Sequence, residues 1–582
     1  MRKVVRTDRE APPAAKRRAL YGMLLVAALA AASLVAFSSP NVAHAQTAGS
    51  LSANTPLCSG QTGDNLDAGL QGQIAASQRA LPGPINCNLT QVASYAGHTP
   101  PCTGCTVGYL STDFYSDGTH NCLYINTGQN FTVGMTAETF STEVVDVTNP
   151  LHPVETDDLT TAAMQSPWES VRVNQARGLL VADSNAEPYL DVYSVKADCT
   201  HPTLLFTGNM PKAEGHEGWF SPDGTVYWMS CLCSNGVWPI DLTDPSHPVQ
   251  MTTAALEGGA TIHGGSVSTD GNRVYMCATS PDELITLDSS GVQSHLPNPT
   301  VPVVGMLALP DNGLCQETYP VSYKGQSYVI QFGEVGSNLG GGCGAAGSPP
   351  GTNPTGLDFS SATLINNADD TAPTLTHDII TQINDPANCA QATGQQSAPP
   401  PGLGDDETAG FYGIFVYGPH MCSPDRLVDP TILACAEEQS GLHVYDIRDP
   451  NHVSELAYWD PGPIPGTPAA GSAPGTPGSL DMFMQRPIID IDHGLIYVNG
   501  DYTGLHVLKF ENSVYPFASS TACPSMPDYY FDQYNPASSC LNPATSTPEG
   551  LPLLMTLGSL GIVGAASGLA VRRRRSRRTA TA

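Results

Sequence analysis

The chain has 582 residues and a formal net charge of −30. Seven basic residues precede position 20 and six follow position 571, so the body between them is more acidic still. Such a surface repels nucleic acid and anionic lipid head groups, which excludes nucleic acid as an expected partner.

The first 45 residues have the pattern of a signal peptide. A basic stretch is followed by an apolar run, residues 20–37, and then by Ala43-His44-Ala45, a small-residue site for cleavage before Gln46. The pair Arg17-Arg18 leaves a twin-arginine signal open as the alternative, in which the protein folds before export. We therefore expect residues 1–45 to direct export and residues 46–104 to form a polar N-terminal extension.

Two stretches further along share one pattern. Residues 216–224 and 263–271 both read His-x-Gly-x-x-Ser-x-Asp-Gly, and a strand-like tract follows each of them. A repeat of this length, built from short strands and Asp-Gly turns, is typical of the blades of a β-propeller. Weaker copies begin at the same distance before a turn residue, at Leu110, Ser170, Glu317 and Arg486.

Counting these copies predicts the fold class. We expect an all-β protein, a β-propeller of seven blades over residues 105–511, with six or eight blades as alternatives. The stretch 331–410 is rich in Gly, Pro and Asn and is expected to be a surface insertion on one blade.

A second repeated sequence pattern, here called the closing phrase, lies near the end of several blades. Residues 142–153, 236–248 and 441–450 combine alternating apolar residues with a proline stop, and residues 504–508 are a truncated copy. Alternation predicts a strand with one buried face, and proline ends it because it has no N–H to donate. At these residues the chain resembles the LVIVD-repeat family of secreted β-propellers. The resemblance implies the fold over about 105–510 and no particular activity, because propellers serve many functions.

The carboxy-terminal end has the pattern of a membrane anchor. Residues 551–571 carry no charge, are long enough to span a bilayer and precede six arginines. We expect a Cys-containing stalk at 512–550, a transmembrane helix at 551–571 and a basic cytoplasmic tail at 572–582. Pro548-Glu549-Gly550 also resembles the sorting signals of bacterial surface proteins, in which case the tail is removed. Either way, the body is expected at the cell surface, on the extracellular face of the membrane.

All 16 cysteines lie between the two ends, and an even number in an exported protein favours disulfides. Closeness in sequence predicts local pairs, namely Cys422 with Cys435, Cys523 with Cys540, Cys122 with the Cys102-x-x-Cys105 motif, and Cys58 with Cys87. A zinc or redox site at Cys102/Cys105 or Cys231/Cys233 is the alternative, although no second spaced pair supports it.

The repeat also predicts a candidate site. The innermost strand of each propeller blade lines the central channel, and the first residue of the pattern is expected to begin that strand. Around the ring this position holds Leu110, Ser170, His216, His263, Glu317, His420 and Arg486. The alternative is an ordinary polar channel filled with water and hydrogen-bonded side chains.

These residues divide into two groups by their chemistry. Imidazoles and a carboxylate can hold a divalent transition metal, which makes the metal-ligand candidates His216, His263, His420 and Glu317. The candidates for binding an organic ligand are Ser170, Glu317 and Arg486, because a guanidinium pairs with a carboxylate or clamps an anion.

Two functions fit this pattern. The first is a surface binding or scaffold module that takes a small molecule, a glycan or a protein at the channel mouth, since the sequence has no nucleophile motif, phosphate loop or dinucleotide fingerprint. The second is a metal-dependent oxidoreductase. Histidine-lined channels are similar to those of the selenium-binding, methanethiol-oxidase-like propellers, and this resemblance implies copper.

Both functions depend on one arrangement. His216 and His263 occupy the same position in consecutive blades, so we expect their imidazoles about 5–10 Å apart, facing the axis. Glu317 is expected next around the ring, His420 on the far side, and Arg486 after it.

Overall fold

The computed structural model describes most of the propeller body. The residues that it describes are 50–51, 64–66, 84–97, 108–128, 140–185, 188–210, 215–230, 236–251, 254–255, 261–280, 282–309, 314–334, 361–382, 418–438, 440–462, 481–491, 493–501, 503–515 and 517. The predicted signal peptide, the transmembrane helix, the tail and nearly all of the stalk lie outside them. In the described part of the chain, no helix combines the length and the apolar character needed to cross a membrane.

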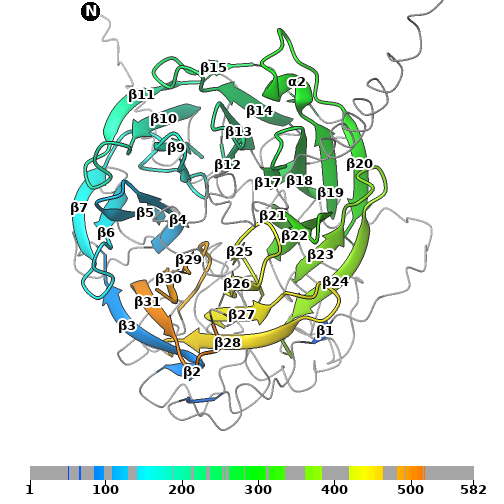
Figure 1. Ribbon diagram of the computed structural model, residues 1–582. Helices are drawn as coiled ribbons and strands as arrows, with labels where there is room; N and C mark the ends of the chain where they lie inside the picture. The colour runs from blue at the N-terminus through cyan, green and yellow to red at the C-terminus, as the bar shows by residue number, and fades with distance from the viewer. Residues whose placement is uncertain are drawn as a thin grey trace, which may run out of the picture. The chain divides into compact units, whose positions relative to one another are not determined.

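The described strands form seven sheets that surround one axis as blades (Figure 1). The innermost strands are β4 (Gly108–Ser116), β8 (Arg172–Asn174), β12 (Glu217–Phe220), β17 (Thr261–Val267), β21 (Leu314–Tyr323), β25 (Met421–Pro424) and β29 (Ile488–Asp490). The second strands are β5 (Asn121–Gly128), β9 (Leu179–Asp183), β13 (Val226–Ser230), β18 (Arg273–Ser280), β22 (Gln326–Glu334), β26 (Ile432–Ala436) and β30 (Leu495–Gly500). The predicted all-β, seven-bladed propeller is confirmed.

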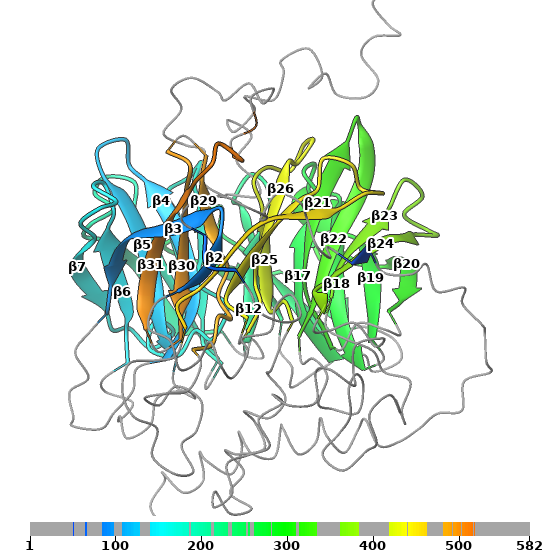
Figure 2. The ribbon, with the colours of Figure 1, turned by 90° about the horizontal axis from the view of Figure 1, so that it is seen from below.

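Two further strands complete each blade, seen from the side in Figure 2. The third strands are β6 (Thr142–Asp146), β10 (Tyr189–Ser194), β14 (Gly236–Asp241), β19 (Asp282–Asp288), β23 (Ala362–Asn366), β27 (Leu442–Asp446) and β31 (Gly504–Phe510). The outer strands are β7 (Val154–Leu159), β11 (Thr203–Asn209), β15 (Val249–Gln250) with β16 (Ala254–Ala255), β20 (Val303–Ala308), β24 (Thr374–Ile380), β28 (Ser454–Asp460) and β3 (Leu89–Tyr95). A short helix, α2 (Ser290–Gln293), precedes β20.

The repeated phrases correspond to the turns and to the third strands. Gly224 and Gly271 have φ values of 66° and 78°, which glycine adopts without strain, and each closes the hairpin from an innermost to a second strand. The closing phrase forms third strands such as β6 and β27. These strands are buried on both faces rather than on the one expected, because each blade packs between two neighbours.

The ring is closed by a strand from the beginning of the chain. Strand β3 pairs antiparallel with β31 and supplies the outermost strand of the seventh blade. It lies within residues 46–104, the expected N-terminal extension. The same region adds β2 (Ile85–Cys87) to the edge of β28 and β1 (Ser50–Leu51) to the edge of β24. The N-terminal segment therefore belongs to three blades.

The stretch 331–410 also contributes to the propeller. Strands β23 and β24, the outer half of the fifth blade, lie inside this range, which the sequence indicated as a surface insertion. The two strands are short, and the sequence on either side of them is rich in Gly and Pro. The composition of the whole stretch therefore indicates a loop, although it contains two strands.

Three disulfides are present among the described residues, and one was predicted correctly, Cys422–Cys435. Cys122 pairs with Cys199 rather than with Cys102 or Cys105, because neighbouring blades bring together cysteines that are 77 residues apart. Cys277–Cys315 likewise joins the fourth blade to the fifth. Cys87 is disulfide-bonded. Of the other cysteines in the predicted pairs, Cys58, Cys102, Cys105, Cys231, Cys233, Cys523 and Cys540 lie outside the described residues.

Candidate metal site

Two of the predicted histidines sit at the start of an innermost strand. His216 precedes β12, and its backbone N–H donates to the carbonyl of Ser230 at 2.7 Å. His420 precedes β25, and its N–H donates in the same way to Ala436 at 2.9 Å. In both blades the bond goes to the end of the second strand, so the two imidazoles enter the channel at the same level.

His263 reaches this level through a β-bulge. Ile262 pairs with Ala278 and Gly265 with Met276, so His263 and Gly264 together face the single residue between them on β18. Bulges of this kind often re-aim a side chain beside an active site.

A carboxylate that the repeat did not predict lies at the centre of the group. The backbone N–H of Glu169 donates to the carbonyl of His216 at 3.2 Å, and Glu169 forms a parallel bridge with Glu217. The preceding residue, Trp168, has a φ of 53°, which is rare for a bulky side chain, and its ring centroid lies 5.4 Å from that of His216. Backbone strain of this kind is typical of functional sites.

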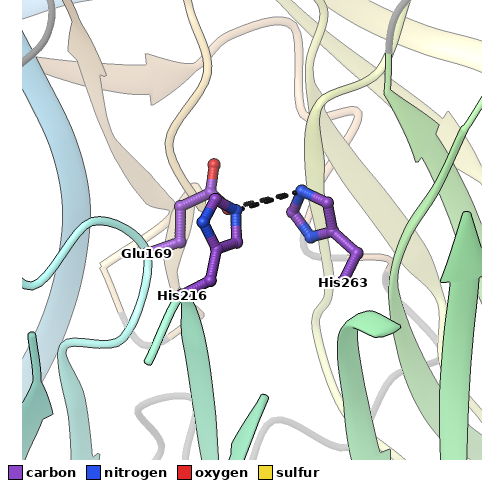
Figure 3. A group of neighbouring side chains, drawn as sticks. All are labelled: Glu169, His216 and His263. Carbon is purple, nitrogen blue, oxygen red and sulfur yellow. Dashed lines mark hydrogen bonds and ion pairs between the residues drawn. The ribbon is translucent and has the colours of Figure 1, made fainter. Parts of the chain in front are cut away.

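The imidazoles converge on the Glu169 carboxylate (Figure 3). The Nε2 atoms of His216 and His263 face each other at 3.2 Å. Oε2 of Glu169 lies 3.3 Å from Nε2 of His216 and 4.0 Å from Nε2 of His263. His420 approaches from the other side, with its Nε2 3.3 Å from Oε1. The four residues are at most 5 % exposed.

The partners at Nδ1 fix which ring nitrogen carries hydrogen. Nδ1 of His216 lies 3.3 Å from the amide oxygen of Asn185, and Nδ1 of His420 lies 2.6 Å from the carbonyl oxygen of Met484. Both oxygens only accept, so Nδ1 of each ring donates, and the Nε2 atoms face Glu169. Nδ1 of His263 lies 3.3 Å from Oε1 of Glu217. Metal-binding histidines are held in this way by acceptors behind the ring.

The carboxylate at the centre is ionised. Burial by itself raises the pKa of Glu169, but the imidazoles of His420, His216 and His263 outweigh burial and hold the pKa at about 2. Nε2 of Gln316 also donates to Oε2 of Glu169 at 3.1 Å. Glu169 therefore offers a negative charge to whatever lies between the imidazoles.

The donor separations match those around a metal ion. At a metal–donor distance of about 2.0–2.1 Å, two donors at a near-tetrahedral angle are roughly 3.3 Å apart. Two of the three separations among His216, His263 and Glu169 are 3.2 and 3.3 Å, and the third is 4.0 Å. The three donor atoms form a compact group that could hold a metal ion. Two imidazoles and one carboxylate suit zinc, copper, iron or nickel.

Below the histidines lies a second polar layer. Glu317 accepts from Nη2 of Arg172 and from Nη2 of Arg486, each at 3.0 Å. Burial opposes the charge of Arg486, but Tyr319, Glu317 and Asp113 outweigh it and raise the pKa of Arg486. Both guanidiniums are buried and positively charged, so the negative charge of Glu317 is paired within this layer.

Glu217 lies between the two layers. Burial and the neighbouring Glu317 raise the pKa of Glu217 to about 8, although His263 acts in the opposite direction. Its carboxyl group is fully buried. The channel is therefore filled by side chains below the histidines, whereas Asn185 is exposed and Trp168 half-buried on the other side.

The structure brings together three of the predicted metal ligands, His216, His263 and His420. The ring centroids of His216 and His263 are 4.5 Å apart, closer than expected, because both lean onto Glu169. Glu317, predicted as metal ligand and ligand-binding residue, lies with Arg486 and Arg172 one layer below.

Ser170, predicted to bind a ligand, is buried and forms hydrogen bonds within its own blade. Its hydroxyl accepts from the Asp183 N–H and lies 2.7 Å from the carbonyl oxygen of Pro167 and 2.8 Å from that of Asp183, to either of which it can donate. The residues at the level of the histidines are instead Glu169 and Gln316, each one position earlier in the chain. In β21 a bulge between Cys315 and Glu317 makes Gln316 the extra residue, and a fixed count from the turn cannot detect it.

Comparisons with known proteins give only distant similarities. No family model matches the sequence, and no curated protein does. Similar solved structures include the β-propeller domain of Cps50 (Swd1) from Myceliophteria thermophila, with 8 % identity, a TM-score of 0.40, and coverage of 69 % of this chain and 97 % of that chain. A putative 6-phosphogluconolactonase from Bacteroides fragilis has 9 % identity and a TM-score of 0.39, with coverage of 70 % and 95 %. A protein from Lactobacillus plantarum has 12 % identity and a TM-score of 0.40, with coverage of 65 % and 99 %. The resemblance to the LVIVD-repeat family stays a prediction.

Proposed function

We propose that the protein is an exported LVIVD-type β-propeller that holds one divalent transition metal, with copper as the first candidate, and binds its ligand there. The metal is held by His216, His263 and Glu169, with His420 on the second carboxylate oxygen. The predicted signal peptide and anchor would place this site at the cell surface. The ligand is then a small molecule or an exposed group of a surface protein or glycan.

One observation carries the proposal. The Nε2 atoms of His216 and His263 face each other at 3.2 Å, and both lie within 4.0 Å of the same carboxylate oxygen of Glu169. Three donor atoms this close together could hold one metal ion. The side chains come from three different blades and are buried, so a bound cation would also offset the charge of the Glu169 carboxylate.

A second candidate function is a metal-dependent oxidoreductase. Sites with three protein donors leave coordination positions for substrate, which is typical of catalytic rather than structural metals. Two histidines and one carboxylate are also the donor set of non-haem iron oxygenases. A metal bound here would supply Lewis-acid or redox chemistry, and the chain's own residues would position the substrate from the side of Trp168 and Asn185.

Metal content and metal titration test the proposal. We expect the full-length protein to retain or bind one equivalent of Cu²⁺, and the variant with both His216→Ala and His263→Ala to bind none with comparable affinity. His247→Ala is the matched control, because the His247 side chain is 81 % exposed and lies in the turn between β14 and the outer strand β15. A folded wild-type protein that binds neither Cu²⁺ nor Zn²⁺, Fe²⁺ or Mn²⁺ stoichiometrically would contradict the proposal.

Oxygen consumption separates the two functions. Copper-loaded wild-type protein and its His216→Ala variant are compared with a panel of small thiols. Uptake by the wild type alone favours the oxidoreductase, and no uptake by a protein that binds one metal favours the binding module.

A further inference from the structure

Glu217 connects two consecutive blades at the candidate metal site. It follows His216 in the third blade, and its carboxyl reaches across to the fourth, where Oε1 lies 3.3 Å from Nδ1 of His263. Glu217 is 0 % exposed and His263 is 2 % exposed. The contact is therefore screened from solvent.

The contact between Glu217 and His263 depends on a small residue at one position of the repeat. Where the third blade has Glu217, the fourth has Gly264. A Cβ atom on residue 264 would lie 1.8 Å from Oε2 of Glu217, so only glycine lets the carboxyl approach so closely. The two copies of the pattern differ here in a complementary way, since one supplies the acid and the other the space.

The three histidines therefore differ in the group behind the ring. His216 has the neutral amide oxygen of Asn185 at Nδ1, and His420 has the backbone carbonyl of Met484. His263 has a side-chain carboxyl group. An acceptor oxygen behind a ligand imidazole fixes the orientation of the ring.

We infer that Glu217 is a positioning residue that holds the imidazole of His263 in the orientation that presents Nε2 to the metal. The inference rests on the proposed function, because it concerns the same site. A residue of the third blade then orients a metal ligand of the fourth.

The test measures Cu²⁺ affinity by competition with a chelator and the copper environment by electron paramagnetic resonance, on the full-length protein. Glu217→Gln keeps the size of the side chain and replaces one carboxyl oxygen by an NH2 group, which cannot accept a hydrogen bond from Nδ1 of His263. We expect Cu²⁺ to bind about 10–100 times more weakly and the parallel hyperfine splitting to change. The control is Glu455→Gln, which alters another buried pair, His443 Nδ1 to Glu455 Oε1 at 2.6 Å, outside the channel. This control should retain the wild-type affinity and spectrum.

The outcomes are distinguishable. If the wild type binds none of Cu²⁺, Zn²⁺, Fe²⁺ and Mn²⁺, the proposed function fails and the inference fails with it. If it binds another of these metals in place of Cu²⁺, the affinities of wild type and variant are compared with that metal. If the wild type binds copper and Glu217→Gln has the same affinity and spectrum, the inference alone is overturned. Should Glu217→Gln not fold, Gly264→Ala keeps the acid but displaces it, and the same change of spectrum is expected. An unchanged spectrum in that variant also overturns the inference.

Discussion

Glu169 connects the histidines at the channel mouth to one another. It contacts histidines from three other blades while its own backbone is bonded to His216. The cost of burying its charge is offset by these imidazoles and by Gln316, which is why the pKa of Glu169 is low although the side chain is buried.

The packing around Gly264 leads to a prediction about a single residue. In Gly264→Ala the new Cβ would lie 1.8 Å from Glu217 Oε2 and 2.7 Å from the carbonyl of Gln316. We expect the free energy of unfolding to fall by about 1–3 kcal/mol, as for other overpacked cores. Urea denaturation measures this.

The matched control for this substitution is Gly291→Ala. A Cβ there meets nothing nearer than 3.4 Å, and residue 291 lies in helix α2, where alanine is favoured. Its stability should stay equal to that of the wild type or rise by up to about 1 kcal/mol. Equal losses in the two variants would mean that the close approach at Gly264 does not matter.

The sequence predicts the histidines of the site but not its carboxylate. His216 and His263 begin two clear copies of one pattern, and in both blades the count to the Asp-Gly turn is the same. Glu169 and Gln316 are displaced by one position, because their blades have a different turn or a bulge. A bulge changes the count without changing the apolar pattern, so no residue type marks it in one sequence.

At the scale of elements, the last strand of the ring contains a buried histidine. His506 on β31 packs between the rings of Trp459 and Phe483. Its Nε2 lies 2.7 Å from the Thr503 hydroxyl, and its Nδ1 lies 3.3 Å from the side-chain oxygen of Gln91 on β3. Burial lowers the pKa of His506 to about 4. This histidine thus stabilises the closing strands only in its neutral form.

Stability should therefore depend on pH through His506. The unfolded chain protonates this residue near its ordinary pKa of about 6.5, and the folded chain only near 4, so the unfolded state binds more protons in between. The free energy of unfolding should fall as pH falls through this window, by up to about 3 kcal/mol from this residue. Urea denaturation at several pH values should show a weaker dependence in His506→Gln.

The control for the pH series is His247→Gln, which changes an exposed histidine on a surface turn. It should keep the wild-type dependence. A His506→Gln variant whose stability falls as steeply as that of the wild type between pH 6.5 and 4 would rule out this role for His506.

At the scale of the whole molecule, the ring depends on β3. Leu89 and the residues after it cover the outer edge of β31, and no other described strand does so. Replacing Leu89–Tyr95 by seven Gly and Ser residues should lower the free energy of unfolding by more than about 3 kcal/mol, since Leu89 alone is buried and its loss leaves a cavity. Urea denaturation and limited proteolysis of the seventh blade measure the effect.

The control changes a strand that takes no part in closing the ring. Ser50→Gly with Leu51→Gly alters β1, which only extends the edge of the fifth blade. This variant should remain close to the wild type. If both replacements have the same effect, ring closure does not depend on β3.

The sequence also predicts the propeller better than it predicts its closure. The repeat identifies the blades because each has its own turn and its own strand pattern. Strand β3 has no such repeated pattern, and its partner strand, β31, lies about 400 residues later in the sequence. The outer strands of the fifth blade are missed for a related reason, since their neighbours in sequence are Gly- and Pro-rich.

The position of β3 has a consequence for biosynthesis. Gln91 and His506, which meet at the closure, are 415 residues apart. At about 5–20 residues per second, a ribosome needs roughly 20–80 s to make the second after the first. For that time β3 has no partner strand, and an unpaired edge with apolar residues invites aggregation. We therefore expect the nascent chain to be more prone to aggregation until the seventh blade is complete.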